Sequence, residues 1–190
     1  NNTPSITMHS ESGHLHGYSY FRLRGMKQEK VNITFNGVPM NDPVNQTFYF
    51  ANFPDLLNSI SNIQIQRGVG TSKNGSSSYA GSIEISSPNL NNTPKKEFGI
   101  GYGSFNSLRA YGIYNSGVKN NKGLYVRLSK VYSDGFKEHS SNNSQSLFLS
   151  TGFFLDKTNW KLNIIAGNSN NELAWIGELK DDIKNDKKVN

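Results

Sequence analysis

The chain has 190 residues, of which 34% are hydrophobic, 18% are charged and none is cysteine. The lack of cysteine excludes disulfides and thiolate metal sites, and no apolar run approaches the roughly 20 residues that a membrane-spanning helix needs. Much of the net charge of +6 comes from Lys95, Lys96 and the mixed-sign C-terminal tail, so we expect a solvated surface and no nucleic-acid partner.

The first half of the chain, residues 1–90, is rich in turns and predicts short strands. Residues 31–35 (VNITF) alternate between apolar and polar side chains, which is typical of a strand. Asn36 and Gly37 follow directly, and this dipeptide favours a two-residue hairpin turn. We therefore expect a small β-hairpin at this point.

A short helix and two further strands are expected next. Pro54 suits the first position of a helix and Asp55 suits its first turn, so we predict a helix over residues 54–60. The alternating segments 61–66 and 82–86 predict strands on either side of a loop rich in glycine and serine.

The loop between these two strands does not match a nucleotide-binding motif. Gly70 and Gly75 have the spacing of a phosphate-binding loop, but Ser76 stands where that motif requires lysine, and a strand follows in place of a helix. Only Gly68 and Gly70 fit the start of a dinucleotide-binding motif. We interpret the loop as backbone that permits tight turns and close contacts.

From residue 97 to residue 167 the pattern changes to longer strands joined by polar turns. The expected strands cover residues 98–103, 107–117, 124–129, 147–155 and 160–167. Apolar side chains dominate one face of the last three: Leu124, Val126, Leu128, Leu147, Leu149, Thr151, Phe153, Leu155, Trp160, Leu162, Ile164 and Ala166. Polar or mixed side chains, among them Arg127 and Ser129, point the opposite way.

Two architectures explain this alternation. A soluble sandwich would turn the apolar face inward, towards its core. Long strands joined alternately by short turns and long loops are instead typical of an outer-membrane β-barrel, whose apolar face contacts lipid. Residues 118–122 and 156–159 are short turns, and residues 132–143 form a long connection. The polar residues 168–190 suit a mobile outer loop.

Aromatic side chains give further support to the membrane architecture. Tyr114, Tyr132 and Trp160 lie near the expected strand ends, where the aromatic girdles of a membrane barrel belong. Tyrosine is also common at the strand ends of soluble proteins, so these positions alone leave both architectures open.

Several short motifs of the first half occur in a characteristic order. They are Arg24-Gly25, Asn36-Gly37-Val38-Pro39, Arg67-Gly68, the loop 69–80, Ala80-Gly81 and the strand 82–86. In this order the first 90 residues or so resemble the plug domain of TonB-dependent outer-membrane receptors. Residues 133–150 also resemble an early barrel strand pair and outer loop of that family. Asn36 stands where the family usually has aspartate, and Ala80 where it usually has glycine.

The resemblance implies a mostly β fold. A small α+β plug domain over residues 1–92 would be followed, over residues 93–190, by the first strands of a large antiparallel transmembrane β-barrel. Five strands cannot close such a barrel, which needs about 22, so the chain is expected to be a fragment. The energy-coupling box that precedes the plug in the family, and most of the barrel, are not in this sequence.

The resemblance also implies transport without catalysis. We expect TonB-dependent import of a scarce nutrient across the bacterial outer membrane, with the plug gating the barrel. A ferric siderophore or other iron chelate is the expected ligand, and glycan, cobalamin and haem are alternatives. TonB and outer-membrane lipid are the expected partners, and a surface lipoprotein is a further candidate. No catalytic set of residues is visible, so neither enzymatic activity nor a cofactor is expected.

The resemblance suggests roles for individual residues. Arg24 and Arg67 are expected to pair with barrel glutamates, because a guanidinium stays charged and binds carboxylates through two hydrogen bonds; otherwise each would simply end a strand in solvent. Turn positions are expected at Gly25, Gly37, Gly68 and Gly81. Candidate ligand-binding residues lie in the plug apices and outer loops: Asn41, Asp42, Gln46, Asn74, Ser76, Tyr79, Tyr132, Phe136, His139 and Trp175.

The sequence also allows a metal site and two other functions to be considered. His9, His14 and His16 suggest metal binding, and His14 and His16 could share one face of a strand. Metal sites need three or four ligands, however, and no third ligand has suitable spacing, so no metal is expected. A soluble β-rich adhesin or binding module would share only the alternating pattern. A surface receptor would bind a partner and import little.

Overall fold

The computed structural model describes residues 4–11, 13, 17–68, 79–90 and 93–189. The chain forms two compact units. The first comprises Asn1–His9, Ser19–Tyr49 and Ile60–Pro88, and the second comprises Ser10–Tyr18, Phe50–Ser59 and Asn89–Asn190. The segment Phe50–Ser59 therefore belongs with the C-terminal strands, although in sequence it interrupts the first unit.

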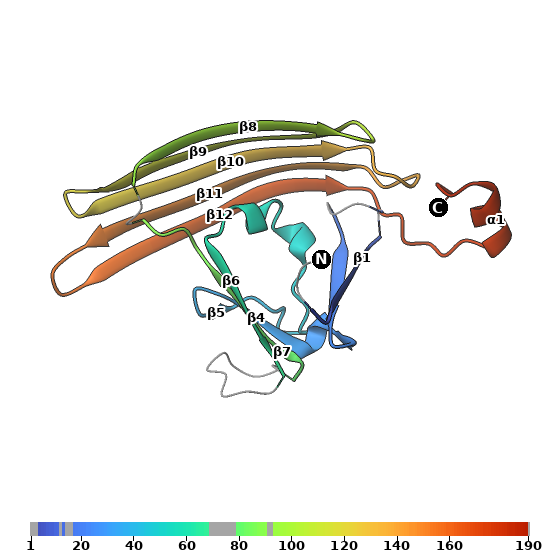
Figure 1. Ribbon diagram of the computed structural model, residues 1–190, viewed down its shortest axis with the longest axis horizontal. Coiled ribbons are helices and arrows are strands. Elements are labelled where there is room, and N and C mark those ends of the chain that lie inside the picture. Colours follow the sequence, from blue (N-terminus) through green and yellow to red (C-terminus); the bar gives the residue numbers. More distant parts are fainter. Residues whose placement is uncertain (1–3, 12, 14–16, 69–78, 91–92, 190) are drawn as a thin grey trace. The chain divides into compact units, whose positions relative to one another are not determined.

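The first unit contains two small sheets (Figure 1). One has the order β1 (Ile6–Ser10), β2 (Ser19–Leu23), β3 (Met26–Lys27). The other has the order β5 (Val38–Pro39), β4 (Val31–Phe35), β7 (Gly81–Ser86), β6 (Asn62–Arg67), in which β4 and β7 run parallel. A single turn of 3-10 helix, η1 (Gln28–Lys30), leads into β4.

Strand β4 forms the centre of this unit, and all five of its residues are buried. Ile83 and Ile85 of the neighbouring strand β7 and Leu23 of β2 are buried as well. Burying such apolar side chains stabilises a fold by about 1.5–3 kcal/mol each, so β4 and its neighbours form the core of the unit.

The turn after β4 has the conformation that its sequence predicts. Asn36 and Gly37 have positive φ angles of 49° and 81°, and Phe35 pairs with Val38 across the turn. Both central residues of a type I′ turn need positive φ, which explains the Asn-Gly dipeptide. The predicted hairpin is confirmed.

The second unit is built on a long, curved, five-stranded antiparallel sheet (Figure 1). Across the sheet its strands are β12 (Asn159–Asn171), β11 (Asn142–Phe154), β10 (Lys122–Ser133), β9 (Ser107–Lys119) and β8 (Lys95–Gly103). All five predicted strands are present, and each is longer than predicted. Sequential strands are neighbours throughout, so the sheet is a simple meander.

The helix predicted over residues 54–60 is wrong. Only two single turns of 3-10 helix form in this region, η2 (Phe50–Asn52) and η3 (Leu56–Asn58). Asp55 has a positive φ of 57°, which lies outside the right-handed helical region and interrupts a helix at that residue.

The end of the chain also contains structure that the sequence did not predict. Strand β12 continues to Asn171, and the short helix α1 (Lys180–Asn185) follows it. No helix within the described residues is both long enough and apolar enough to span a membrane.

The five-stranded sheet has an apolar face that is exposed and a polar face that is buried. On the apolar face, the exposed fractions are 56% for Leu128, 56% for Leu162 and 67% for Trp160. On the polar face, Arg127 and Ser150 are almost completely buried. A water-soluble sheet has the reverse arrangement. The prediction that the apolar side chains point away from the protein core is confirmed.

Two of the three aromatic residues that were expected at strand ends lie there. Tyr132 is the last residue but one of β10, and Trp160 is the second residue of β12. Tyr114 instead lies inside β9, opposite Val126 of β10, because β9 continues to Lys119. The prediction for Tyr114 is therefore wrong.

Candidate functional site

The polar face of the sheet carries an aromatic ring that lies directly on a glycine. Tyr111 of β9 is the register partner of Gly99 of β8, and a Cβ added to Gly99 would lie 2.4 Å from the Tyr111 ring. The hydroxyl of Tyr111 donates a hydrogen bond of 2.7 Å to Glu97. Gly99 thus leaves the space that the ring occupies, which is one role of glycine inside a strand.

Two arginines flank Tyr111 on this face. Arg109 lies two residues before Tyr111 on β9. Ser129 of β10 is the register partner of Tyr111, and Arg127 lies two residues before Ser129 on the same strand. The guanidinium carbons lie 5.4 Å (Arg109) and 5.1 Å (Arg127) from the ring centroid. Cation–π contacts of this kind contribute about 0.5–2 kcal/mol each, so the ring helps to position both guanidinium groups. We call Arg109 and Arg127 the arginine pair.

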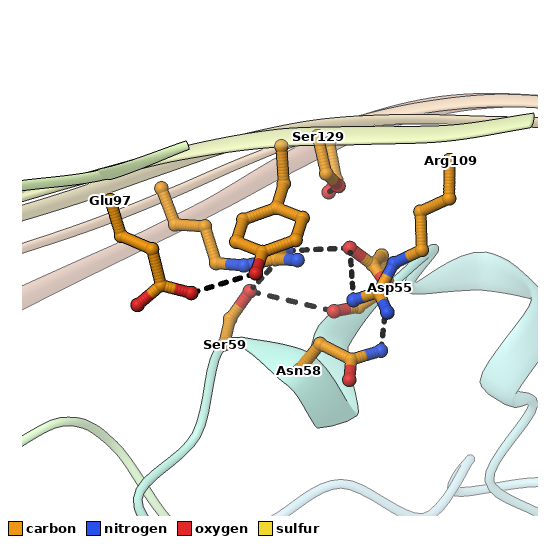
Figure 2. A network of polar contacts seen from close by, with 9 residues as sticks. Asp55, Asn58, Ser59, Glu97, Arg109 and Ser129 are labelled. Atoms are coloured by element: carbon orange, nitrogen blue, oxygen red, sulfur yellow. Dashed lines mark hydrogen bonds and ion pairs between the residues drawn. The ribbon is translucent and has the colours of Figure 1, made fainter. Parts of the chain in front are cut away.

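Asp55 supplies one carboxylate to both members of the arginine pair (Figure 2). Nη1 of Arg127 lies 2.6 Å from Oδ2 of Asp55, and Nη2 of Arg109 lies 3.1 Å from Oδ1. The side chains of Asp55 and Arg127 are only 4% and 1% exposed, whereas that of Arg109 is 34% exposed. Nη1 of Arg127 also donates a hydrogen bond of 3.3 Å to Ser59. Buried charges require such pairing, because desolvation alone is strongly unfavourable.

These surroundings lower the pKa of the Asp55 carboxyl below its usual value. Burial by itself would raise that pKa, since a buried carboxylate loses its hydration. The hydrogen bond from Ser129 and the positive charges of Arg127 and Arg109 outweigh burial. Asp55 is therefore ionised at neutral pH.

Further contacts connect the Phe50–Ser59 segment to the sheet. A Cβ added to Gly167 of β12 would lie 2.9 Å from Cγ of Pro54, so glycine leaves the room that the proline ring occupies. Within the segment, the side-chain amide of Asn58 donates a hydrogen bond of 2.7 Å to Oδ1 of Asp55. Asp55 is thus oriented both by its own segment and by the strands.

Asn41, a predicted ligand residue of the first unit, uses its polar groups on strand β4 and on its own loop. Oδ1 of Asn41 accepts a hydrogen bond of 2.7 Å from the backbone of Ile33, and its amide nitrogen donates to the carbonyls of Val31 and Gln46 at 3.0 and 2.7 Å. The Asn41 side chain therefore fixes the loop after β5 against β4.

The neighbouring candidates Asp42 and Gln46 are also engaged locally. Oδ1 of Asp42 accepts hydrogen bonds from the backbone N–H groups of Val44 and Asn45. The Gln46 side chain donates to the carbonyl of Pro43 at 3.2 Å. Tyr79, in contrast, is 71% exposed. The candidates Asn74 and Ser76 lie outside the described residues.

The two predicted arginines of the first unit are exposed and lie close to each other. Arg24 forms with Gly25 the turn between β2 and β3, and Arg67 is the last residue of β6. A Cβ added to Gly68 would lie 3.5 Å from Nη1 of Arg24. Within the described ranges, neither guanidinium has an ion-pair partner.

The four predicted turn glycines all have positive φ. The angles are 78°, 81°, 84° and 151° for Gly25, Gly37, Gly68 and Gly81. Gly81 is the most restricted of them, because a Cβ there would lie 2.2 Å from the carbonyl oxygen of Gln66 on the paired strand β6.

Four ligand candidates remain in the second unit. Tyr132 lies at the end of β10, Phe136 and His139 lie in the loop after β10, and Trp175 lies in the loop after β12. The loops are connected, because the backbone N–H of Glu172 donates a hydrogen bond of 2.9 Å to Ser141. Phe136 packs edge-on against Phe105 with ring centroids 5.5 Å apart. Trp175 is 70% exposed. The structure thus connects the two loops that carry Phe136, His139 and Trp175, and Tyr132 lies at the strand end from which the first loop begins.

The histidines do not form a metal site in the part of the chain that the structure describes. His9 stacks on Tyr20 with ring centroids 5.2 Å apart. His14 and His16 lie outside the described residues. Among the described residues, no group of three or more histidine, aspartate or glutamate side chains is close enough to hold a metal ion.

Sequence reasoning missed the ion network around Asp55. It placed Arg127 on the polar face but assigned it no role, and it used Asp55 only as a helix-start signal. One signal was available. Arg109 and Arg127 lie on neighbouring predicted strands, and arginines that are buried need a carboxylate close by. No pattern within the strands could identify that acid as Asp55.

Comparison with known proteins gave matches at the level of the family and of the fold. Residues 1–82 match the model of the TonB-dependent Receptor Plug Domain. A search of curated proteins gave no match. Among solved structures, the ferric citrate transporter FecA in its unliganded form has a TM-score of 0.76 and 18% identity, covering 100% of this chain and 30% of FecA.

Two further solved structures share the fold. The copper transporter OprC has a TM-score of 0.74 and 17% identity, covering 90% of this chain and 28% of OprC. The ferric yersiniabactin uptake receptor FyuA from Yersinia pestis has a TM-score of 0.61 and 16% identity, covering 88% of this chain and 27% of FyuA. The chain therefore spans less than a third of the length of each of these proteins.

Proposed function

We propose that this protein takes part in active import of a scarce nutrient across the bacterial outer membrane. The first support is that residues 1–82 match the TonB-dependent receptor plug domain family. The chain has the fold of the N-terminal region of such receptors. These receptors are not enzymes, so the ligand would be moved without chemical change.

The inverted polarity of the five-stranded sheet is the observation that carries this proposal. An exposed apolar face and a buried polar face are expected when the exposed side contacts lipid and the other side lines a barrel interior. In this proposal residues 93–190 supply the first barrel strands, residues 1–92 form the plug, and the plug gates the barrel.

An iron chelate, most simply a ferric siderophore, is the proposed ligand. FecA and FyuA are named for ferric citrate and ferric yersiniabactin, and this is the basis for the choice. OprC is named as a copper transporter, so a copper species is the second candidate. Tyr79 and Trp175 are the strongest candidates for direct ligand contact, because both are large, aromatic and more than two-thirds exposed.

The proposed partners follow from the same assignment. TonB would supply the energy for import, outer-membrane lipid would cover the apolar face, and a surface lipoprotein could cap the loops. Arg24 and Arg67 are proposed to pair with glutamates of the barrel, since both are exposed and have no ion-pair partner among the described residues.

Uptake measurements in cells test this proposal. Cells that carry the complete receptor gene are supplied with radiolabelled iron bound to a panel of siderophores, with and without a functional TonB. We expect uptake of at least one chelate that disappears without TonB, and receptor that fractionates with the outer membrane. Receptor that remains in aqueous solution without detergent would contradict the proposal and favour the adhesin alternative.

A further inference from the structure

The arginine pair on the polar face offers more positive charge than Asp55 neutralises. Two guanidinium groups share this single carboxylate, while the nearby Glu97 is engaged by Lys95 at 2.5 Å and by Tyr111 at 2.7 Å. The local balance around Asp55 is therefore two positive charges to one negative charge. Because Arg127 is buried and Arg109 is only one-third exposed, such an excess of positive charge is unfavourable unless the site has a use for it.

The arginine pair also has hydrogen-bond donors that Asp55 does not use. An arginine side chain carries five N–H donors in a fixed plane. Asp55 takes one terminal nitrogen from each arginine, and Nε of Arg109 and of Arg127 is buried without a partner among the described residues. Buried polar groups are rarely left unpaired, so these two deserve an explanation.

The arginine pair and Asp55 are supported by different parts of the fold. Arg109 and Arg127 project from long strands in fixed register, and the Tyr111 ring positions both of them. Asp55 lies between two single turns of 3-10 helix and has a positive φ of 57°, which is unfavourable for a residue other than glycine. Departure of its segment would therefore leave the arginine pair in place.

We propose that Arg109, Arg127, Tyr111 and Ser129 form an anion-binding site on the polar face, which Asp55 occupies in the resting protein. The site would accept a ligand carboxylate in place of Asp55 when the Phe50–Ser59 segment leaves the sheet. Planar guanidinium groups bind carboxylates through two parallel hydrogen bonds, which favours carboxylate-bearing ligands over neutral ones. A contact of this site with the imported ligand rests on the proposed import function, in which movement of the plug would take the Phe50–Ser59 segment off the sheet.

Replacing Asp55 by a small neutral residue and adding a free carboxylate tests the site directly. The full chain with Asp55→Ala is purified in detergent, and its melting temperature and binding heat are measured with succinate. Succinamide serves as the neutral analogue of the same shape, and sodium chloride keeps the ionic strength equal. We expect succinate to bind Asp55→Ala at least ~10-fold more tightly than the wild type, since a charge-assisted pair contributes this much.

Two controls separate this site from a general effect of charge. Asp181→Ala removes a carboxylate that is 86% exposed and that, among the described residues, pairs with Lys184 alone, and it should bind succinate no better than the wild type. The double variant Asp55→Ala/Arg127→Gln should lose the gain in affinity. If Asp55→Ala does not fold, Asp55→Gly is titrated in its place, because glycine accepts the positive φ of this position and also leaves the carboxylate space open.

The results that would overturn the site are distinct from those that would overturn import. Equal responses of Asp55→Ala to succinate and succinamide, or equal succinate affinity in Asp55→Ala and the wild type, would remove the anion site. Neither result depends on TonB or on uptake, because binding is measured on purified protein. Loss of the import proposal would leave a succinate-binding site intact but without a transported ligand.

Discussion

Asp55 and Arg127 form an ion pair with an N–O distance of 2.6 Å, in which both side chains are almost completely removed from solvent. Fully buried pairs of this kind differ from surface ion pairs, whose contribution to stability is small. Desolvation of the two charges is offset only while both partners are present. The pair therefore makes the Phe50–Ser59 segment sensitive to the loss of a single charge.

Replacing Asp55 by alanine is expected to destabilise the second unit by about 3 kcal/mol or more, because Arg127 would remain buried without a counter-charge. Urea unfolding of the purified chain in detergent measures the loss. The matched control is Asp181→Ala, whose carboxylate is 86% exposed, and its effect should stay below about 0.5 kcal/mol. Equal effects of the two substitutions would show that the buried pair contributes nothing.

Low pH should weaken the contact between Asp55 and the arginine pair. The pKa of Asp55 is lowered in the folded protein, so its contribution to stability is complete above the pKa of an unfolded aspartate, about 3.9. That contribution is lost as the pH falls from this value towards the lower folded pKa. Because hydrogen bonds from Tyr132 and Asn106 also lower the pKa of Asp134, the wild type alone would not isolate Asp55.

The difference between the wild type and Asp55→Asn isolates the titration of Asp55. We expect the difference in the free energy of unfolding to be constant from pH 7 to about pH 5 and to shrink below about pH 4. Unfolding curves in urea at several pH values provide the measurement. A difference that stays constant down to the most acidic conditions would contradict the ionised state assigned to Asp55.

Gly99 and Gly101 offer a test of how Tyr111 is positioned. Both are on the polar-face side of β8, but a Cβ at Gly99 would lie 2.4 Å from the Tyr111 ring, whereas a Cβ at Gly101 would meet nothing within 4 Å. Gly99→Ala should destabilise the chain by about 1–3 kcal/mol, because the ring must move away from the arginine pair. Gly101→Ala should be neutral in the same unfolding assay. Similar results for both would mean that the ring has room to adapt.

A charge on the apolar face should interfere with membrane insertion. Leu162 is 56% exposed on that face, and Leu162→Arg is expected to lower the stability of the inserted sheet by about 2–4 kcal/mol. Asn168→Arg is the control. Asn168 lies on the same face of β12, but its register partner is the polar Gln145, so an arginine there should have little effect. The fraction of receptor recovered in folded form from outer membranes measures both. Normal recovery of Leu162→Arg would indicate that the face does not contact lipid.

The sequence allowed the strands and their faces to be predicted because a strand has a side-chain period of two. Leu128 and Arg127 are adjacent in sequence, yet one is exposed and the other buried, as the alternation requires. The strand ends were less predictable. β10 begins two residues earlier and ends four residues later than expected, since register with β9 and β11 decides where pairing stops.

The conformation of Asp55 and its partners could not be predicted from local sequence. Pro54 and Asp55 carry a helix-start signal, but the φ angle of Asp55 is positive in the folded protein, where its carboxylate contacts residues more than 50 positions away. Local propensity is a weak influence next to one buried and one partly exposed ion pair. Long-range pairing of this kind becomes visible only once the register of β9 and β10 is known.

Gly123 and Gly152 are register partners on β10 and β11, and both lie under the buried side chain of Leu90. A Cβ at Gly152 would lie 2.8 Å from Cδ1 of Leu90, and one at Gly123 would lie 3.1 Å from its Cβ. The three positions share one fixed volume, so we expect them to change together during evolution. A homologue with alanine or serine at either glycine position should carry a smaller residue than leucine at position 90.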